Sequence, residues 1–264
     1  MAALAAVALA AVLTAASPSG PPRAVVGGSP ADTATYPFAV ALSSRAEYGS
    51  ARSGQFCGGT LIAPTKVLTA AHCMYDANGK REDRADLKVI QGRTDLRTKQ
   101  GREVVVGEVY VNPNFDPSLI SGDWAVLTLD EPLGTGVASM VEQDADVYAS
   151  GTASTVVGWG DTTGRGDYSS TLRQVTVPLV SDATCRTAYP GGRFGSYDAA
   201  AMVCAGERLG GKDACSADSG GPLLVAGRIA GIVSWGEGCA LAGKPGVYTR
   251  VAAFARDIRD AAGL

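Results

Sequence analysis

Two residues of this sequence have the types and surroundings needed for nucleophilic catalysis. His72 is the one histidine among 264 residues, and Ser219 lies in the segment CSADSGGP (215–222). An imidazole has a pKa near neutrality, so it can take the proton of a serine hydroxyl while that hydroxyl attacks a carbonyl. A lone histidine is more often structural, but its occurrence with this serine segment favours a hydrolase in which His72 is the base.

The order of residues along the chain separates the known serine–histidine–acid arrangements. His72 precedes Ser219, which excludes the order Ser–Asp–His, and Ala217 breaks the G-x-S-x-G motif of the same folds. The order Asp–His–Ser would require Asp32, which has no strand-end context. The order His–Asp–Ser remains. Asp123, in SGDWAVLTLD, is then the best acid, because it enters the core at a strand edge where a buried carboxylate needs a partner.

Many short apolar or alternating segments must position these side chains. They form one batch before and one batch after a polar, acidic connector around 131–150: 38–44, 59–73, 87–92, 104–111 and 125–130, then 154–160, 172–180, 221–236 and 246–251. Two batches of short strands predict two β-barrels or a pair of sandwiches. In the tail, Phe254 and Ile258 lie four residues apart between charges, which predicts one short C-terminal helix.

The N-terminus and the cysteines indicate export. Residues 2–16 are apolar and Ala-rich, shorter than a comfortable membrane span, and are followed by small residues and prolines. This pattern predicts a signal peptide over 1–16 and a short propeptide over 17–24, rather than a membrane anchor. The even number of cysteines and the lack of a C-x-x-C pair favour three disulfides over a zinc or dithiol site: Cys57, Cys73, Cys185, Cys204, Cys215 and Cys239.

The charge pattern gives little support for charged ligands. The net charge is −3, from 23 basic and 26 acidic residues, with no long basic run, so nucleic acid is not an expected partner. The charged segments 79–86 and 92–103 flank a predicted strand, and we interpret them as solvated loops.

Six segments, in order, resemble the trypsin-like serine proteases, and in particular the secreted trypsins of bacteria. They are VVGG (25–28), LTAAHC (68–73), GDWAVLTL (122–129), VVGWG (156–160), KDACSADSGGP (212–222) and SWGEGC…KPGVY (234–248). The resemblance extends from Val25 to the end of the chain. It implies an all-β fold of two six-stranded antiparallel Greek-key barrels, 25–135 and 136–250, followed by a C-terminal helix over 251–264. The disulfide pairing it implies is 57–73, 185–204 and 215–239.

The resemblance also implies roles for the residues identified above. Ser219 would attack the scissile carbonyl, His72 would carry the proton, and Asp123 would hold the useful imidazole tautomer. The backbone N–H groups of Ala217 and Ser219 would form the oxyanion hole. Alanine keeps that N–H, but a positive φ there would cost about 1–2 kcal/mol, so we expect a penalty of about tenfold rather than inactivity.

Substrate choice would depend on Asp213, six residues before the nucleophile, because this position resembles the floor of the trypsin specificity pocket. A carboxylate buried in a narrow slot recruits a cation, which predicts cleavage after Arg or Lys. Gly236 and Gly246 would leave the walls of the slot open for a long side chain.

Neighbouring residues refine this expectation. Ala214, beside Asp213, offers no hydroxyl to a compact ammonium, whereas a guanidinium can pair with the carboxylate through two hydrogen bonds, so we expect Arg to be preferred over Lys. Ser234, Trp235 and Gly236 would pair with the substrate backbone as an added strand.

Through the same resemblance, the segment VVGG implies activation by cleavage, in which a new N-terminus folds inward. The new amine of Val25 would fold inward and pair with Asp218, so the precursor would be a zymogen. The chain departs from the family pattern because Ala24, not Arg23, directly precedes Val25. Cleavage after Arg23 would leave one residue too many, so cleavage after Ala24 or trimming is needed.

No cofactor is expected. The loop 92–103 is largely basic, which argues against calcium there and leaves open a site elsewhere. We expect an extracellular monomer, free of membrane after processing, that meets polypeptide substrates and protein protease inhibitors. Two alternatives remain: a catalytically silent homologue that acts as a binding module, and a disulfide-rich structural domain.

Overall fold

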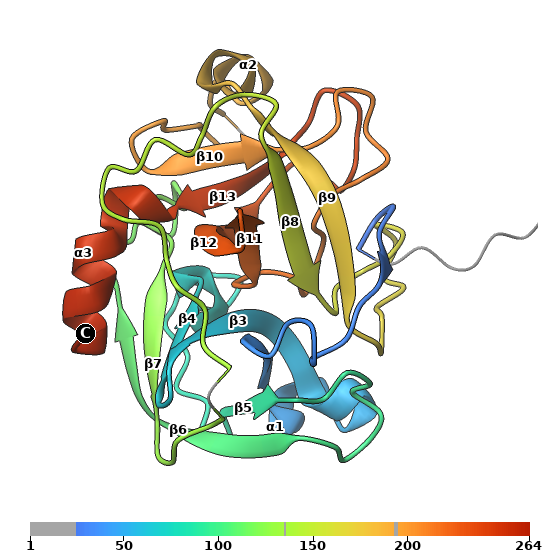
Figure 1. Cartoon of the computed structure of the whole chain (residues 1–264), viewed down its shortest axis with the longest axis vertical. Helices are drawn as coiled ribbons and strands as arrows, with labels where there is room; N and C mark the ends of the chain where they lie inside the picture. The colour runs from blue at the N-terminus through green and yellow to red at the C-terminus, as the bar shows by residue number, and fades with distance from the viewer. Residues whose placement is uncertain (1–24, 135, 193–194) are drawn as a thin grey trace, which may run out of the picture.

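Two closed antiparallel β-barrels form most of the computed structural model, which describes residues 25–134, 136–192 and 195–264 (Figure 1). The predicted signal peptide (1–16) and propeptide (17–24) lie outside the described residues. The first barrel pairs its strands in the order β2-β3-β4-β7-β6-β5 and closes where β5 pairs with β2. Its strands are β2 (Ala39–Ser43), β3 (Gln55–Ala63), β4 (Lys66–Thr69), β5 (Lys88–Gln91), β6 (Arg102–Val111) and β7 (Ala125–Leu129).

The second barrel pairs its strands in the order β8-β9-β10-β13-β12-β11 and closes where β11 pairs with β8. The short β1 (Ser29–Pro30) adds to β9. The barrel strands are β8 (Ala153–Gly158), β9 (Arg173–Val180), β10 (Met202–Ala205), β11 (Pro222–Val225), β12 (Arg228–Trp235) and β13 (Gly246–Arg250). The all-β class and the two six-stranded barrels are confirmed.

The C-terminal helix is confirmed as α3 (Val251–Ala262), which ends at Gly263 with a left-handed φ of 70°. In Figure 1 it lies beside β7 of the first barrel, and the ring of Phe254 is 6.4 Å from that of Trp124. The sequence analysis predicted no other helix, yet the described residues contain four short helical segments. They are α1 (Arg45–Tyr48), η1 (Ala51–Gly54), η2 (Ala71–Met74) and α2 (Asp182–Ala188). Each has at most seven residues, which is too short to show a helical repeat of apolar residues.

The barrels meet with their backbones very close together. A Cβ atom added at Gly58 of β3 would lie 3.2 Å from the Cα of Gly221, which directly precedes β11. This spacing lets the N–H of Gly58 donate to the carbonyl of Ser219 at 2.7 Å. The predicted nucleophile of the second barrel is thereby attached to a strand of the first.

Three disulfides join segments of the described chain, and two of them fix loops that carry the candidate site. They join Cys57 to Cys73, Cys185 to Cys204 and Cys215 to Cys239, which is the pairing that the resemblance implied. The first connects β3 to η2 beside the predicted base, and the third connects the loop that precedes β11 with the loop that follows β12.

Candidate active site

His72 and Asp123 meet where two strands of the first barrel end and begin. Strand β4 ends at Thr69 and leads into η2, which carries His72, while Asp123 lies two residues before β7. The imidazole Nδ1 and one carboxylate oxygen of Asp123 are 2.7 Å apart, and the backbone N–H of His72 donates to the other oxygen at 2.8 Å. Two contacts to one carboxylate fix the orientation of the ring.

The second barrel completes the surroundings of this acid. The hydroxyl of Ser234 donates to the Asp123 carboxylate at 2.5 Å, and the hydroxyl of Thr249 donates to its backbone carbonyl at 2.7 Å. The side chain of Asp123 is 1% exposed and that of His72 is 29% exposed. Ser234, which the sequence analysis placed along the substrate, therefore also contacts the acid directly.

The charges of this pair stabilise each other. Burial of the imidazole opposes its protonated form, but the charge of Asp123 and their hydrogen bond outweigh burial and raise the pKa of His72 above its ordinary value. Burial also opposes the charged form of Asp123, yet the charge and hydrogen bonds of His72, with the hydrogen bond from Ser234, lower the pKa of Asp123. The arrangement thus favours an ionised acid beside a basic imidazole.

Ser219 lies on the same cleft as His72. A depression of about 560 Å³ is lined by His72, Ala217 and Ser219, together with side chains of the segment 48–57. Among the described residues, no hydrogen bond joins the hydroxyl of Ser219 to the imidazole. Catalytic hydrogen bonds are often long in free enzymes and shorten when substrate binds.

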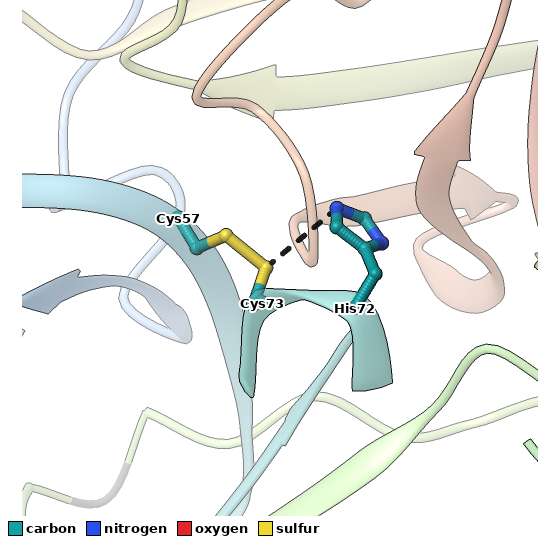
Figure 2. A group of neighbouring side chains, drawn as sticks. All are labelled: Cys57, His72 and Cys73. Carbon is teal, nitrogen blue, oxygen red and sulfur yellow. Dashed lines mark hydrogen bonds between the residues drawn. A yellow bond between two sulfur atoms is a disulfide. The ribbon is translucent and has the colours of Figure 1, made fainter. Parts of the chain in front are cut away.

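The free imidazole nitrogen lies beside the first disulfide. Figure 2 shows the ring next to the bridge between Cys57 and Cys73, and Nε2 is 4.0 Å from the sulfur of Cys73. The three residues form the one cluster of metal-ligand types within the described part of the chain. Both sulfur atoms belong to the disulfide, so neither is a thiolate that could bind a metal ion.

Ala217 has the backbone conformation that the sequence analysis considered a risk. Its φ is 69°, in the left-handed region where a side chain with a Cβ is strained. The N–H of Asp161 donates to the carbonyl of Ser216 at 2.8 Å, and the side chain of Gln55 donates to the carbonyl of Ala217 at 2.7 Å. The peptide unit that carries the Ala217 N–H is therefore held on both sides.

Asp213 lies in a second, narrower cavity of about 230 Å³, which Ser219 also lines. One oxygen of the carboxylate accepts the N–H of Ala240 at 2.9 Å. The other oxygen has no hydrogen-bond partner among the described residues, although the residue is only 3% exposed. Burial raises the pKa of Asp213 to about 7, despite that hydrogen bond from Ala240. A cation in this cavity would find an oxygen ready to accept its hydrogen bond.

The two glycines of the cavity differ in what they allow. A Cβ atom added at Gly246 would lie 2.6 Å from the unpartnered oxygen of Asp213, so any side chain there would displace the carboxylate or block the cavity. At Gly236 the nearest atom to an added Cβ is 3.6 Å away, an ordinary contact. Ala214, Ser234 and Trp235 also line the cavity.

Asp218, the residue directly before Ser219, is fully buried. Its two carboxylate oxygens accept the N–H groups of Gly160 at 2.7 Å and Cys215 at 3.0 Å. A Cβ atom added at Gly158 or Gly160 would lie within 2.4 Å of this carboxylate. Burial raises the pKa of Asp218 to about 7, although these hydrogen bonds favour its charged form. Val25 is also fully buried, and the carbonyl of the next residue accepts the N–H of Asp213 at 3.1 Å.

The interpretation of 92–103 as a solvated loop is wrong for its ends. Arg93 is only 3% exposed, and its guanidinium pairs with Glu103 at 2.5 Å. Arg45 pairs with the same carboxylate at 2.7 Å. The hydrogen bond from Arg45 is the main cause that lowers the pKa of Glu103 to about 2, with Arg93 adding to it. Charge composition indicates solvent exposure only when the charged groups lack partners in distant segments.

Sequence reasoning missed Gln55, Arg52 and Thr249. Gln55 and Thr249 are buried and contact the candidate site through hydrogen bonds to backbone carbonyls. None of the three belongs to a motif with a chemical signature, so the sequence held no signal for them.

Within the described residues, no helix is long and apolar enough to cross a membrane.

Comparisons with known proteins agree with this geometry. The family model described as Trypsin matches residues 25–258. A trypsin of Saccharopolyspora erythraea is 43% identical over 230 residues, which cover 87% of this chain and 94% of that protein. Trypsin-1 of Astacus astacus is 37% identical over 235 residues, covering 86% and 95% of the two chains, and the trypsin of Sus scrofa is 34% identical over 239 residues, covering 89% and 94%.

These matches extend over nearly the whole described chain, and they agree with the two barrels and the three disulfides. They support a hydrolase that is a serine endopeptidase. The chain belongs to the trypsin family.

Proposed function

We propose that this chain is a secreted endopeptidase, made as a zymogen, that cleaves polypeptides after Arg ahead of Lys. The carrying observation is the arrangement around Ser219. It lines both the cleft that contains the paired His72 and Asp123 and the cavity that contains Asp213. A nucleophile between a base and a specificity pocket is the arrangement that acyl transfer after a basic residue requires.

The proposed chemistry has two halves. In the first, the hydroxyl oxygen of Ser219 bonds to the scissile carbonyl carbon while His72 Nε2 takes the hydroxyl proton. The carbonyl oxygen becomes an oxyanion that accepts the N–H groups of Ala217 and Ser219. When the C–N bond breaks, the imidazolium gives its proton to the leaving amine, and an ester to Ser219 remains. In the second half, water attacks that ester, His72 again moves the proton, and the carboxylic acid is released.

Asp123 would supply orientation and charge rather than take the proton. Its hydrogen bond to Nδ1 keeps the proton of neutral His72 on that nitrogen, which leaves Nε2 free as the base. Its negative charge then stabilises the imidazolium that forms. The raised pKa of His72 agrees with this role.

Asp213 would select the residue on the acyl side of the cleaved bond. A buried carboxylate with one unpartnered oxygen is costly alone and favours a bound cation. The neighbouring Ala214 has no hydroxyl, so a lysine ammonium would find fewer acceptors than it can use, whereas a guanidinium pairs with the carboxylate directly. This argument supports Arg ahead of Lys.

Activation would depend on Val25 and Asp218. Asp218 is buried with a raised pKa, so an ammonium group beside it would stabilise its charged form. Cleavage before Val25 would create such a group in a residue that is itself fully buried. The three disulfides and the similarity to trypsins support an extracellular location, with polypeptide substrates and protein protease inhibitors as partners.

The test is hydrolysis of matched Arg, Lys and Phe peptide substrates by protein that begins at Val25, with active-site titration alongside. We expect turnover of Arg ahead of Lys, far slower turnover of Phe, and no titratable site in Ser219→Ala. A correctly processed protein that binds protein protease inhibitors but neither titrates nor cleaves would instead support the silent binding module.

A further inference from the structure

The peptide unit between Ser216 and Ala217 must point its N–H into the cleft if it is to stabilise an oxyanion. A trans peptide is planar, so its carbonyl points away from its N–H. The N–H of Asp161 holds this carbonyl at 2.8 Å. That contact sets the direction of the peptide plane, but it leaves the next torsions, at Ala217 itself, to be fixed by other groups.

Ala217 resists the conformation that this direction requires. Its φ of 69° lies where an alanine is disfavoured relative to an ordinary right-handed or extended conformation. Glycine would adopt the same φ with little penalty. A relaxing φ turns either the preceding peptide, whose carbonyl Asp161 holds, or the following carbonyl of Ala217, so in this chain a contact on the second side is also needed to outweigh the strain.

Gln55 makes the contact that opposes this turn. Its side-chain amide donates to the carbonyl of Ala217 at 2.7 Å and to the carbonyl of Cys57 at 3.2 Å. Gln55 is 4% exposed, so its amide cannot readily exchange these partners for water. A rotation at Ala217 would break the shorter bond and leave a buried donor unpaired.

Arg52 in turn holds Gln55. One guanidinium nitrogen, Nη2, donates at 2.5 Å both to the amide oxygen of Gln55 and to the carbonyl of Trp159, while Nε donates to the carbonyl of Ser169 at 2.8 Å. The guanidinium also lies 5.1 Å from the centre of the Tyr168 ring. Because the amide oxygen of Gln55 accepts from Arg52, its nitrogen must face Ala217.

We propose that Arg52 is a positioning residue that holds the strained Ala217 N–H in the oxyanion hole through Gln55. The inference rests on the proposed function, since it concerns the same site. Arg52 contacts no reacting atom. It joins β3 of the first barrel to the segment 159–169 of the second, and so it couples the orientation of the donor to the packing of both barrels.

Inhibition by two different ligands can distinguish positioning of the oxyanion-hole donor from a general structural role of Arg52. Benzamidine is an amidinium cation that would pair with Asp213 and would not use the oxyanion hole. A peptide argininal would form a tetrahedral adduct with Ser219, in which the former carbonyl oxygen occupies the position of the oxyanion. The ratio of the two inhibition constants therefore reports on contacts that only the adduct makes, the oxyanion hole among them, and it cancels changes in the cation pocket.

Arg52→Ala and Gln55→Ala, made in protein that begins at Val25, should weaken argininal inhibition and lower kcat by about tenfold, with benzamidine inhibition changed less than twofold. Gln55→Glu keeps an acceptor for Arg52 but loses the donor to Ala217, so it should lose as much as Gln55→Ala. Arg52→Lys should be intermediate, because an ammonium lacks the planar fork. Arg102→Ala, which removes an exposed arginine that also binds a carbonyl, is the matched control and should change neither constant.

The decisive experiment asks whether Ala217→Gly restores the activity that Arg52→Ala loses. Ala217→Gly removes the strain, so Arg52→Ala in that background should reduce kcat by less than about threefold. An unchanged ratio of inhibition constants in Arg52→Ala, an equal loss of both ligands, or no rescue by glycine would each overturn the inference. Failure of the proposed function would look different, because the unaltered protein would then bind neither ligand and cleave nothing.

Discussion

Asp123 and Asp213 are both buried carboxylates, yet their surroundings are opposite. Asp123 accepts hydrogen bonds from His72 and Ser234 and has a lowered pKa, whereas Asp213 has one unpartnered oxygen and a pKa raised to about 7. The first acid has its partners within the protein, and the second lacks a cation that a substrate could bring. A buried carboxylate whose hydrogen-bond partners all lie within the protein can orient a neighbouring catalytic group. A buried carboxylate with an unpartnered oxygen instead favours a ligand that supplies the missing partner.

The largest expected loss of activity follows substitution of Asp123, the acid whose partners lie within the protein. Asp123→Asn should keep the geometry but place a donor against Nδ1, which favours the wrong imidazole tautomer and lowers kcat by about 10⁴. Steady-state kinetics at pH 7 with an Arg substrate measure this loss. A fall in kcat of only a few fold would mean that Asp123 does not orient the base.

Substitution of Asp213, the acid with an unpartnered oxygen, should change the choice of substrate more than the rate of the chemical step. Asp213→Asn should lower kcat/KM for Arg substrates by about 10³, because the guanidinium would lose its charged partner in a buried cavity. The matched Phe substrate should lose little, since its hydrolysis does not use that charge. Equal losses for Arg and Phe substrates would contradict the assignment of Asp213 as the specificity residue.

The pH dependence of ligand binding should distinguish the two acids directly. The pKa of Asp213 is raised, so its carboxylate is charged above about pH 7 and becomes protonated as the pH falls through that value. Benzamidine affinity should therefore fall about tenfold per pH unit below 7. Calorimetry on His72→Ala removes the imidazole from the titration, and a constant affinity between pH 5 and 8 would contradict the raised pKa.

A smaller effect is expected at the neighbour of Asp213. Ala214→Ser would give a bound ammonium one more acceptor, so kcat/KM for Lys should rise about threefold to tenfold relative to Arg. Competition between matched Arg and Lys peptides in one reaction measures the ratio. A ratio that does not move would mean that the preference arises elsewhere in the cavity.

Glu103 extends the comparison to a carboxylate with two cationic partners. Arg45 and Arg93 hold it and lower its pKa to about 2, so a calcium ion at this loop would have to displace two guanidinium groups. We expect calcium and a chelator to give the same midpoint of thermal unfolding, with magnesium as the control cation. A midpoint raised by calcium alone would indicate a site elsewhere in the chain.

The sequence allowed the candidate site to be predicted where residue type itself was informative. The one histidine, its order relative to Ser219 and the strand edge at Asp123 led to the pairing of His72 with Asp123 that the structure contains, and the resemblance implied the disulfide pairing and the barrels. The left-handed conformation of Ala217 and the contacts of Arg52, Gln55 and Arg93 were not predictable. They depend on loops that meet only after both barrels have formed, and an arginine in a charged segment gives no sign of a buried partner.

The hydrogen bonds from Ser234 and Thr249 to Asp123 have a consequence for the timing of biosynthesis. The strands of the first barrel are complete at Leu129, so His72 and Asp123 emerge from the ribosome long before Ser219, Ser234 and Thr249. The growing chain thus carries the proposed acid and base without the proposed nucleophile, and Asp123 still lacks the two hydroxyls that hold it. In the proposed mechanism, a nascent chain therefore has no complete site until nearly its last residues have been added, and cleavage before Val25 would still have to follow.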